Sequence, residues 1–179
     1  MPGEGALLAA IFERARDERR WTHKQVLALV DSLTEEQVLR QPGEHAPSIG
    51  FHIWHLARWA DYDAHRHDGS PEIWVARSLD EAWGFPSQLG EAAAGTGLDD
   101  DASARLPLPG KEPLLDYARA AFADLDATVE QLVEEAQRQG NAGNDAVELV
   151  VTYATHDNRH LGMIEALRGL LGLQGTATN

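Results

Sequence analysis

The chain has 179 residues, of which 15 are lysine or arginine and 29 are aspartate or glutamate, so its formal net charge is −14. A chain of this length can fold around one hydrophobic core, and we expect a single domain over residues 1–179. The negative charge repels phosphate backbones and argues against nucleic acid as a partner. Because the sequence contains no cysteine, disulfides, thiolate metal ligands and a cysteine nucleophile are excluded, and any thiol chemistry requires an external thiol.

No segment has the apolar length that a targeting or membrane-spanning helix requires. The first residues, MPGEGALLAAIFERARDERR, contain only a short apolar run and then become charged. No later apolar run approaches the roughly 20 residues of a membrane span. The sequence therefore predicts a cytoplasmic protein that has no membrane as a partner.

The first part of the chain predicts two long helices with a short helix between them. Apolar residues recur at helical spacing over residues 6–33. The sequence LTEEQ then predicts an N-cap at Thr34 and a short helix that ends at the Pro-Gly pair 42–43. Ser48 is the expected N-cap of a second long helix, which ends near His67.

A long irregular crossover, residues 69–110, follows this helix. It combines tryptophan and phenylalanine with segments rich in glycine, alanine, aspartate and proline, and one short helix is expected at residues 79–83. Connections of this length are uncommon inside a compact domain and are often functional. Two interpretations remain open: part of the crossover packs as a cover, or the crossover is a tolerated surface insertion.

Two further long helices complete the chain. Residues 111–140 restore the helical period of apolar side chains, and the last helix is expected to begin near Asn144 or Asp145 and to end around residues 169–172. No strand-like alternation and no repeat interrupts this pattern. The chain is therefore predicted to be all-α, a four-helix bundle with a long crossover between its second and third long helices.

The last helix carries two histidines, His156 and His160, four residues apart. The helix face opposite these histidines, which includes Arg159 and Arg168, is predicted to be exposed to solvent. Imidazoles at this spacing can converge on one ion, but a chain with eight histidines often contains such a pair by chance, so a third ligand has to decide. The stripe predicted to face the core comprises Leu149, Tyr153, His156, His160, Met163, Leu167 and Leu170.

The second long helix contains four histidines that could supply this ligand. His65 and His67 lie near its polar end, where a solvated role is expected. His52 and His55 lie among large apolar side chains, three residues apart, and either one can point at the bundle axis. A buried pair on one helix and a buried histidine on another favour a metal site over hydrogen-bonded core histidines.

Two better-known metal sites do not fit the sequence. The segment HDNRH resembles the zincin motif H-E-x-x-H, but Asp157 stands where the longer general-base glutamate belongs, and no histidine follows His160. A ferritin-like di-iron bundle needs Glu-x-x-His pairs, and the sequence contains none. A zinc peptidase and a di-iron protein are therefore both disfavoured.

Two segments, WHLARWAD in the second long helix and HDNRHLGMIEALRGL in the last, resemble the DinB-like superfamily of four-helix bundles. The resemblance implies one divalent metal, nickel, zinc, iron or manganese, bound by one histidine of the second helix and an H-x-x-x-H pair of the fourth. In this sequence the pair is His156 and His160, and the histidine of WHLA is His55, with His52 as the runner-up. Many relatives carry glutamine where this chain has Met163, so the polar contact of that glutamine is not expected here.

The superfamily includes bacterial transferases and hydrolases that act with bacillithiol or mycothiol. The resemblance therefore implies a homodimeric, metal-dependent enzyme that transfers a low-molecular-weight thiol to a small-molecule electrophile or hydrolyses a small substrate. The alternative is a non-catalytic helical (dimeric) domain whose metal is structural or absent. No catalytic residue is assigned, since surface pairing along the helix is expected for each acid or base candidate: Asp61, Tyr62, Asp63, Tyr153, Asp157 and Arg159.

Overall fold

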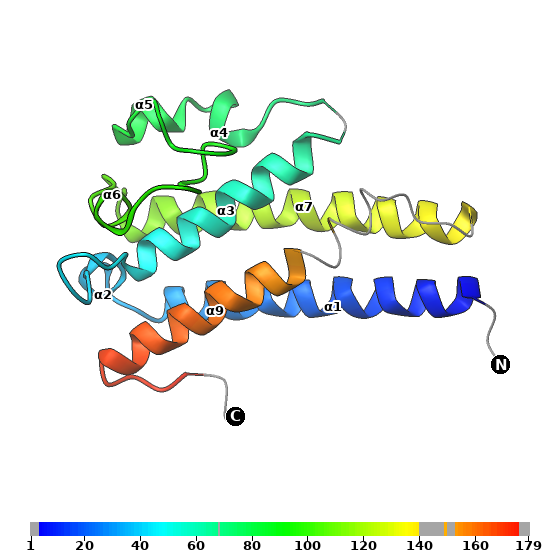
Figure 1. Ribbon diagram of the computed structural model, residues 1–179, viewed down its shortest axis with the longest axis horizontal. Helices are drawn as coiled ribbons and strands as arrows, with labels where there is room; N and C mark the ends of the chain where they lie inside the picture. Colours follow the sequence, from blue (N-terminus) through cyan, green and yellow to red (C-terminus); the bar gives the residue numbers. More distant parts are fainter. Residues whose placement is uncertain (1–3, 68, 140–148, 150–152, 176–179) are drawn as a thin grey trace.

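Four long helices form the body of the molecule (Figure 1). The computed structural model describes residues 4–67, 69–139, 149 and 153–175, and this part of the chain contains no β-strand and no helix that is long and apolar enough to span a membrane. The first and second long helices each pack against both the third and the fourth. The predicted all-α four-helix bundle is confirmed. Its long helices are α1 (Glu4–Asp31), α3 (Ile49–His65), α7 (Lys111–Gln139) and α9 (Tyr153–Leu170).

The helix starts follow the local sequence signals. Helix α2 (Glu35–Leu39) begins after Thr34, whose hydroxyl accepts from the backbone N–H of Gln37, while the Gln37 side chain accepts from the backbone N–H of Thr34. The hydroxyl of Ser48 accepts from the backbone N–H of Phe51 and caps α3. Both predicted N-caps are confirmed.

The helix ends also lie close to the predicted positions. Helix α3 ends at His65, two residues before the predicted end, and α7 ends at Gln139, one residue before the predicted end. The predicted start of the last helix, at Asn144 or Asp145, lies outside the described residues.

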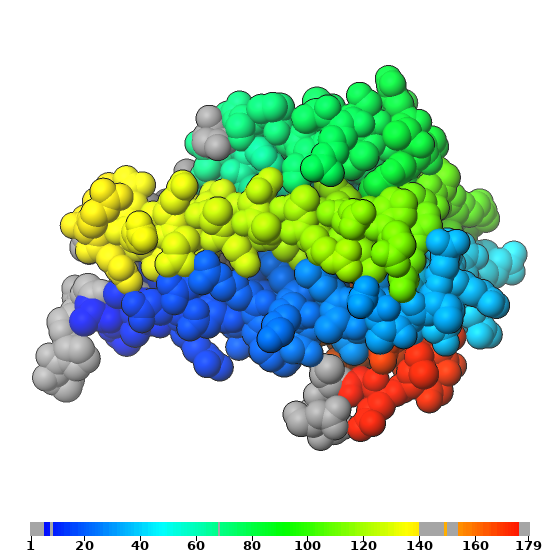
Figure 2. Space-filling view, turned by 180° about the vertical axis from the view of Figure 1, so that it is seen from behind, coloured from blue at the N-terminus to red at the C-terminus, as the bar shows by residue number. Residues whose placement is uncertain are grey.

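Helix α3 is the central element of the bundle. Of its 17 residues, 15 are buried. It packs against α7 and α9, while α1 and α7 lie side by side along the opposite face of the molecule (Figure 2). A helix that is buried nearly all round has to be enclosed on all sides, and the polar groups that it carries inward must find partners in the interior.

The crossover provides the remaining cover for α3. It contains α4 (Ile73–Ala76), α5 (Leu79–Trp83) and α6 (Asp100–Ala104), so the short helix predicted at residues 79–83 is present (Figure 1). Of the two interpretations left open by the sequence, the structure supports the one in which the crossover packs as a cover, because several of its side chains are buried in the core. The crossover side chains buried in the core include Trp74, Phe85, Leu89 and Leu106.

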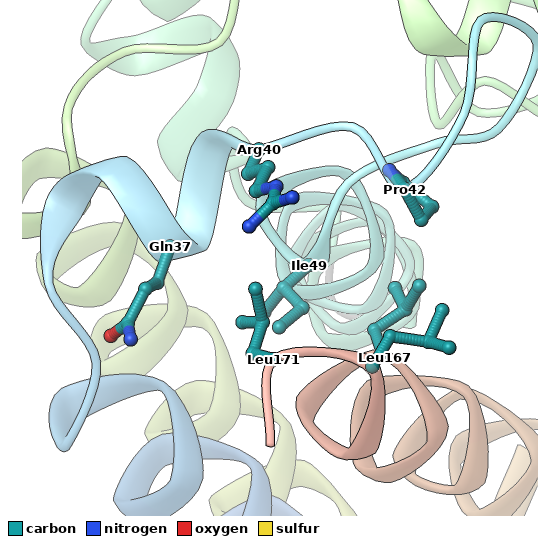
Figure 3. Close-up of a pocket in the computed structure, with 7 residues that line it drawn as sticks. Gln37, Arg40, Pro42, Ile49, Leu167 and Leu171 are labelled. Carbon is teal, nitrogen blue, oxygen red and sulfur yellow. The ribbon is translucent and has the colours of Figure 1, made fainter. Parts of the chain in front are cut away.

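A small cavity lies at the end of the bundle where α2, α3 and α9 meet (Figure 3). Its volume is about 210 Å³, and Arg40 and Pro42 close it on one side while Leu167 and Leu171 close it on the other. An open groove of about 490 Å³ adjoins it and reaches His52. None of the residues that line the cavity is a histidine, so the cavity is separate from the histidine positions singled out in the sequence.

Candidate metal centre

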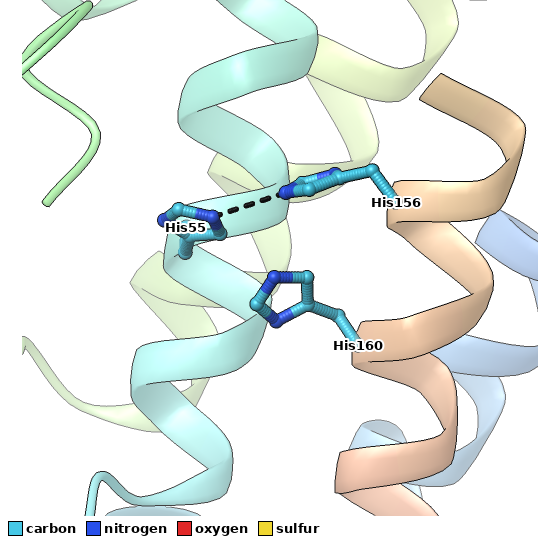
Figure 4. Close-up of side chains that lie close together, drawn as sticks. All are labelled: His55, His156 and His160. Carbon is cyan, nitrogen blue, oxygen red and sulfur yellow. Dashed lines mark hydrogen bonds between the residues drawn. The ribbon is translucent and has the colours of Figure 1, made fainter. Parts of the chain in front are cut away.

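Three histidines from two helices come together in the interior (Figure 4). His55 projects from α3 toward α9, and His156 and His160 project from successive turns of α9 toward α3. One ring nitrogen of each lies within 4.8 Å of the other two, and the Nε2 atoms of His55 and His156 are 3.2 Å apart. Ring nitrogens bound to one ion at about 2.1 Å lie about 3.0 to 3.4 Å from each other, so the three imidazoles could hold a metal ion.

The other ring nitrogen of His55 and of His156 is held by an acceptor of the protein. Nδ1 of His55 donates to the backbone carbonyl of Ala94 at 2.6 Å. Nδ1 of His156 donates to Oδ1 of Asp157 at 3.0 Å. Because a carbonyl and a carboxylate only accept, both imidazoles carry their proton on Nδ1 and present a lone pair at Nε2. Tautomers fixed in this way are typical of histidines that bind metal.

The short distance between the Nε2 atoms of His55 and His156 bears on whether a metal ion fits between the two rings. With both protons on Nδ1, two acceptor atoms face each other across 3.2 Å. Protonation of His55 would remove this repulsion, but burial lowers the pKa of His55 to about 4 despite its hydrogen bond to Ala94. A cation between the rings would satisfy both lone pairs, so the donor set fits a metal ion.

His52 lies beside the cluster and not within it. Its Nδ1 atom is 3.0 Å from Nδ1 of His160, and this hydrogen bond leaves Nε2 of His160 as the nitrogen that could bind a metal ion. Burial lowers the pKa of His52 to about 4 and that of His160 to about 2, with neighbouring imidazoles adding to the shift of His160. Both rings are therefore neutral at neutral pH. The structure groups His55 with the H-x-x-x-H pair, and His52 contacts this group through its hydrogen bond to His160.

A buried carboxylate, Asp157, holds His156 in place. Its Oδ2 atom accepts from Nε of Arg19 at 3.1 Å and lies 3.1 Å from Nε2 of His23, and both of these residues belong to α1. Arg19 also donates to the backbone carbonyl of Leu149 at 2.8 Å. Burial by itself raises the pKa of Asp157, but Arg19 and the hydrogen bonds from His156 and His23 hold it well below its usual range. Asp157 is therefore an ionised acceptor that ties the candidate site to α1.

The expected surface pairing of Asp157 is wrong, because the side chain is buried between α1 and α9. Sequence reasoning also assigns no role to its partners Arg19 and His23. Their spacing of four residues puts both on one face of α1, and this was the only signal available for them. His23 is further fixed by stacking on Phe122, with ring centroids 3.9 Å apart.

The buried face of α9 also differs from the predicted stripe. Met163 and Leu170, predicted to face the core, are 40% and 74% exposed, whereas Arg168, predicted to be solvated, is 8% exposed. Arg168 donates to the backbone carbonyl of Leu29 at 2.8 Å and to Oγ of Ser32 at 2.9 Å. The predicted stripe is therefore correct for Leu149 and His160 but wrong for Met163 and Leu170, because α9 buries charged side chains that have partners on α1. The residues of α9 buried in the structure are Ala154, Asp157, His160, Leu161, Ile164 and Arg168.

Asp61, another candidate acid or base, is a structural residue. It is fully buried and accepts from Arg58 at 3.1 Å, from the hydroxyl of Tyr117 at 2.8 Å and from two backbone N–H groups at the start of α4. The expected surface pairing is therefore wrong for Asp61 as well. His65 lies 2.7 Å from the carbonyl oxygen of Asp61, and neither His65 nor His67 belongs to the cluster.

The remaining candidates also lie outside the cluster. Asp63 pairs along the helix with Arg66 at 3.2 Å as expected, but it is buried, so the expected position at the surface is wrong. Tyr62 is half-buried, with its ring edge-on to Trp59, and Arg159 is exposed as expected. The side chain of Tyr153 lies outside the described residues. Apart from the ionised Asp157, which accepts from His156, no acid or base candidate with a described side chain belongs to the cluster or hydrogen-bonds to it.

Comparison with known proteins gives a family match and a solved structure of similar fold. Residues 18–164, which include all three histidines, match the DinB superfamily. A solved structure described as the crystal structure of the conserved protein of locus from Enterococcus faecalis has a similar fold, with a TM-score of 0.65, 16% sequence identity, and coverage of 88% of this chain and 96% of that chain. No curated protein matches. At this identity the structural likeness concerns the fold alone, but the family match spans most of the sequence, and the chain belongs to the DinB superfamily.

Proposed function

We propose that the protein binds one divalent metal ion through His55, His156 and His160 and that it is a metal-dependent enzyme. One observation carries the proposal: the three imidazoles converge from α3 and α9 while acceptors of the protein hold Nδ1 of His55 and His156. Zinc, iron and nickel all accept imidazole ligands, and the family resemblance adds manganese.

An open coordination position supports a catalytic role over a structural one. Three neutral imidazoles leave a divalent ion its full charge and at least one position for a small molecule, as in catalytic sites. Among the described residues, no fourth histidine or carboxylate joins the three, and His52 is engaged with His160. The side chain of His156 is 20% exposed, so a small molecule can approach the cluster from solvent.

The proposed reaction is the transfer of a low-molecular-weight thiol to a small electrophile, with hydrolysis of a small substrate as the second candidate. A divalent ion at this position supplies a Lewis acid that lowers the pKa of a water or thiol toward neutrality. The thiol has to be a small molecule, because the chain contains no cysteine. The protein orients the ligand nitrogens through Ala94 and Asp157, and Asp157 is not a proton donor because its pKa is far below neutrality.

Replacement of a ligand tests the metal site. We expect His156→Ala to lose the metal that the purified wild-type protein binds, and to lose the rise in melting temperature when Zn²⁺, Ni²⁺, Mn²⁺ or Fe²⁺ is added. A ligand present at about 100 times its Kd stabilises a folded protein by about 2.7 kcal/mol. His45→Ala is the control, since this exposed histidine lies outside the cluster. An unchanged metal content in His156→Ala would rule out the site.

A second measurement separates the enzyme from the alternative, a non-catalytic (dimeric) domain with a structural metal. The metal-loaded protein is incubated with a small thiol and a chromogenic electrophile, and thiol consumption is compared with that of His156→Ala. We expect faster consumption only in the metal-loaded wild type. Stoichiometric metal binding with no difference in rate would support the structural role. Sedimentation of the same samples tests the homodimer that the resemblance implies.

A further inference from the structure

A short loop of the crossover, residues 90–97 (GEAAAGTG), lies against α3. The backbone N–H of Gly95 donates to the carbonyl of Leu89 at 2.6 Å and closes the loop. A methyl group at Gly90 would lie 1.9 Å from the carbonyl oxygen of Thr96, so only glycine fits there. The loop is therefore a tight turn with one defined conformation.

Two alanines of this loop adopt a backbone conformation that alanine avoids. Ala92 has a φ of 53° and Ala93 has a φ of 49°, in the left-handed region, which costs a non-glycine residue about 1 to 2 kcal/mol. Arg58 holds both: Nη2 donates to the carbonyl of Ala92 at 2.5 Å, and Nε lies 3.4 Å from the carbonyl of Ala93. Strain that persists at a defined point of a loop indicates a functional requirement for what the loop presents.

The loop presents the carbonyl of Ala94, the acceptor that holds Nδ1 of His55. Ala94 is fully buried, and its neighbours are fixed on α3 as well. Nε1 of Trp59 donates to Oγ1 of Thr96 at 3.1 Å, and a methyl group on Gly95 would lie 3.0 Å from a tryptophan ring. The α3 residues that contact the loop are Trp54, His55, Arg58 and Trp59, all within the segment WHLARWAD.

Arg58 is itself anchored in the core. Its guanidinium donates to Asp61 at 3.1 Å, to the hydroxyl of Tyr117 at 3.0 Å and to Glu72 at 2.7 Å. These partners come from α3, α7 and the start of α4, so the arginine joins three elements to the loop. A cation with this many fixed acceptors holds the loop carbonyls in one position.

We propose that Arg58 and the loop 90–97 are a positioning device for His55, which fixes its Nδ1–H tautomer and so sets the affinity of the cluster for a metal ion. The affinity part of this inference rests on the proposed function. If the loop carbonyl moves away, His55 loses its acceptor, and the tautomer that carries the proton on Nε2 becomes populated. That proton occupies the lone pair that a metal ion requires, so affinity falls.

A pair of glycine substitutions in the same loop tests the device. Gly95 and Gly97 have φ values of 82° and 87°, so alanine is strained at both, but a methyl group presses on the Trp54 ring only at Gly95. In metal-free ¹⁵N-labelled protein we expect Gly95→Ala to lower the Nδ1–H fraction of His55. By titration with Zn²⁺ we expect its Kd to rise about 10- to 100-fold. For Gly97→Ala we expect both readouts to stay close to those of the wild type.

Arg58→Lys is the second variant, and it covers the case in which Gly95→Ala does not fold. An ammonium keeps the charge beside Asp61 but lacks the planar fork that reaches the loop carbonyls. We expect the same shift of the His55 tautomer. If both folded variants keep His55 on Nδ1–H and bind Zn²⁺ like Gly97→Ala, the positioning device is wrong. If the wild type binds no metal, the proposed function fails. The tautomer measurement alone then tests whether Arg58 and the loop position His55.

Discussion

The two helices that supply the histidines hold them in different ways. On α3, Nδ1 of His55 is held by a backbone carbonyl, that of Ala94, in a loop fastened by an arginine of the same helix. On α9, Nδ1 of His156 is held by a side chain, that of Asp157, which is fastened by an arginine of α1. The same result, a lone pair directed inward, is obtained once from a backbone conformation and once from a buried charge.

This difference determines which substitutions each side tolerates. The α9 side depends on an ion pair between helices that are distant in sequence, so loss of one charge leaves the other buried without its charged partner. The α3 side depends on the path of the backbone, so side chains in the loop can change while the carbonyl stays. The following predictions test this contrast.

The largest expected effect is the pH dependence of stability in the metal-free protein. Burial lowers the pKa of His52 and His55 from 6.5 to about 4, and that of His160 from 6.5 to about 2. The unfolded chain therefore takes up protons that the folded chain does not, and stability falls as the pH drops from about 6.5 toward 4. Each such histidine contributes a slope of up to about 1.4 kcal/mol per pH unit, which is reached between the two pKa values.

Urea unfolding at several pH values between about 7 and 5 measures this slope. An NMR titration of the imidazoles should also show His55, on α3, protonating before His160, on α9. A free energy of unfolding that stays constant over this range, or the reverse order of protonation, would contradict the prediction.

The next effect is loss of the charge that supports the α9 side. Arg19→Met removes the guanidinium 3.1 Å from Asp157 and leaves a buried carboxylate. We expect the free energy of unfolding to fall by about 3 to 5 kcal/mol, measured by urea unfolding. Arg14→Met is the control, because Arg14 lies on the same helix, is 82% exposed and pairs with Glu18 at 3.5 Å. Its expected change is within about 1 kcal/mol, and equal losses in the two variants would refute the special role of the buried pair.

The bundle could be predicted from the sequence because its signals are local. Thr34 and Ser48 cap their helices through residues three positions further on, and the apolar period marks the long helices. The path of the crossover could not be predicted, because its buried aromatic residues, such as Trp74 and Phe85, take their positions from helices distant in sequence.

The three histidines of the candidate site could be predicted from spacing and motif, but their supports could not. Asp157 pairs with Arg19 across 138 positions, and no local pattern marks such a partner. The carbonyl of Ala94 could not be predicted as the acceptor of His55 for another reason. Every residue has a backbone carbonyl, and only the fold determines which carbonyl faces His55. Arg168 is predicted to lie on the solvated face because hydrophobicity does not record its partner on α1.

The smallest expected effect comes from matched alanine-to-glycine substitutions on the two sides. Ala92→Gly relieves a positive φ on the α3 side and keeps the carbonyl that Arg58 holds. The relief of about 1 to 2 kcal/mol is partly offset by about 0.4 to 1 kcal/mol of added freedom in the unfolded chain. We expect a net gain in the free energy of unfolding of up to about 1.6 kcal/mol, with the Kd for Zn²⁺ unchanged within about twofold.

Ala154→Gly is the counterpart on the α9 side. Ala154 is buried in the first turn of α9, so glycine there lowers helix propensity and removes a packed methyl group. We expect a loss of about 1 kcal/mol, measured by the same urea unfolding. Opposite signs for the two substitutions would show that one ligand helix relies on a strained backbone and the other on regular packing. A loss in Ala92→Gly as large as that in Ala154→Gly would mean that the alanine side chains of the loop, and not its backbone path, support His55.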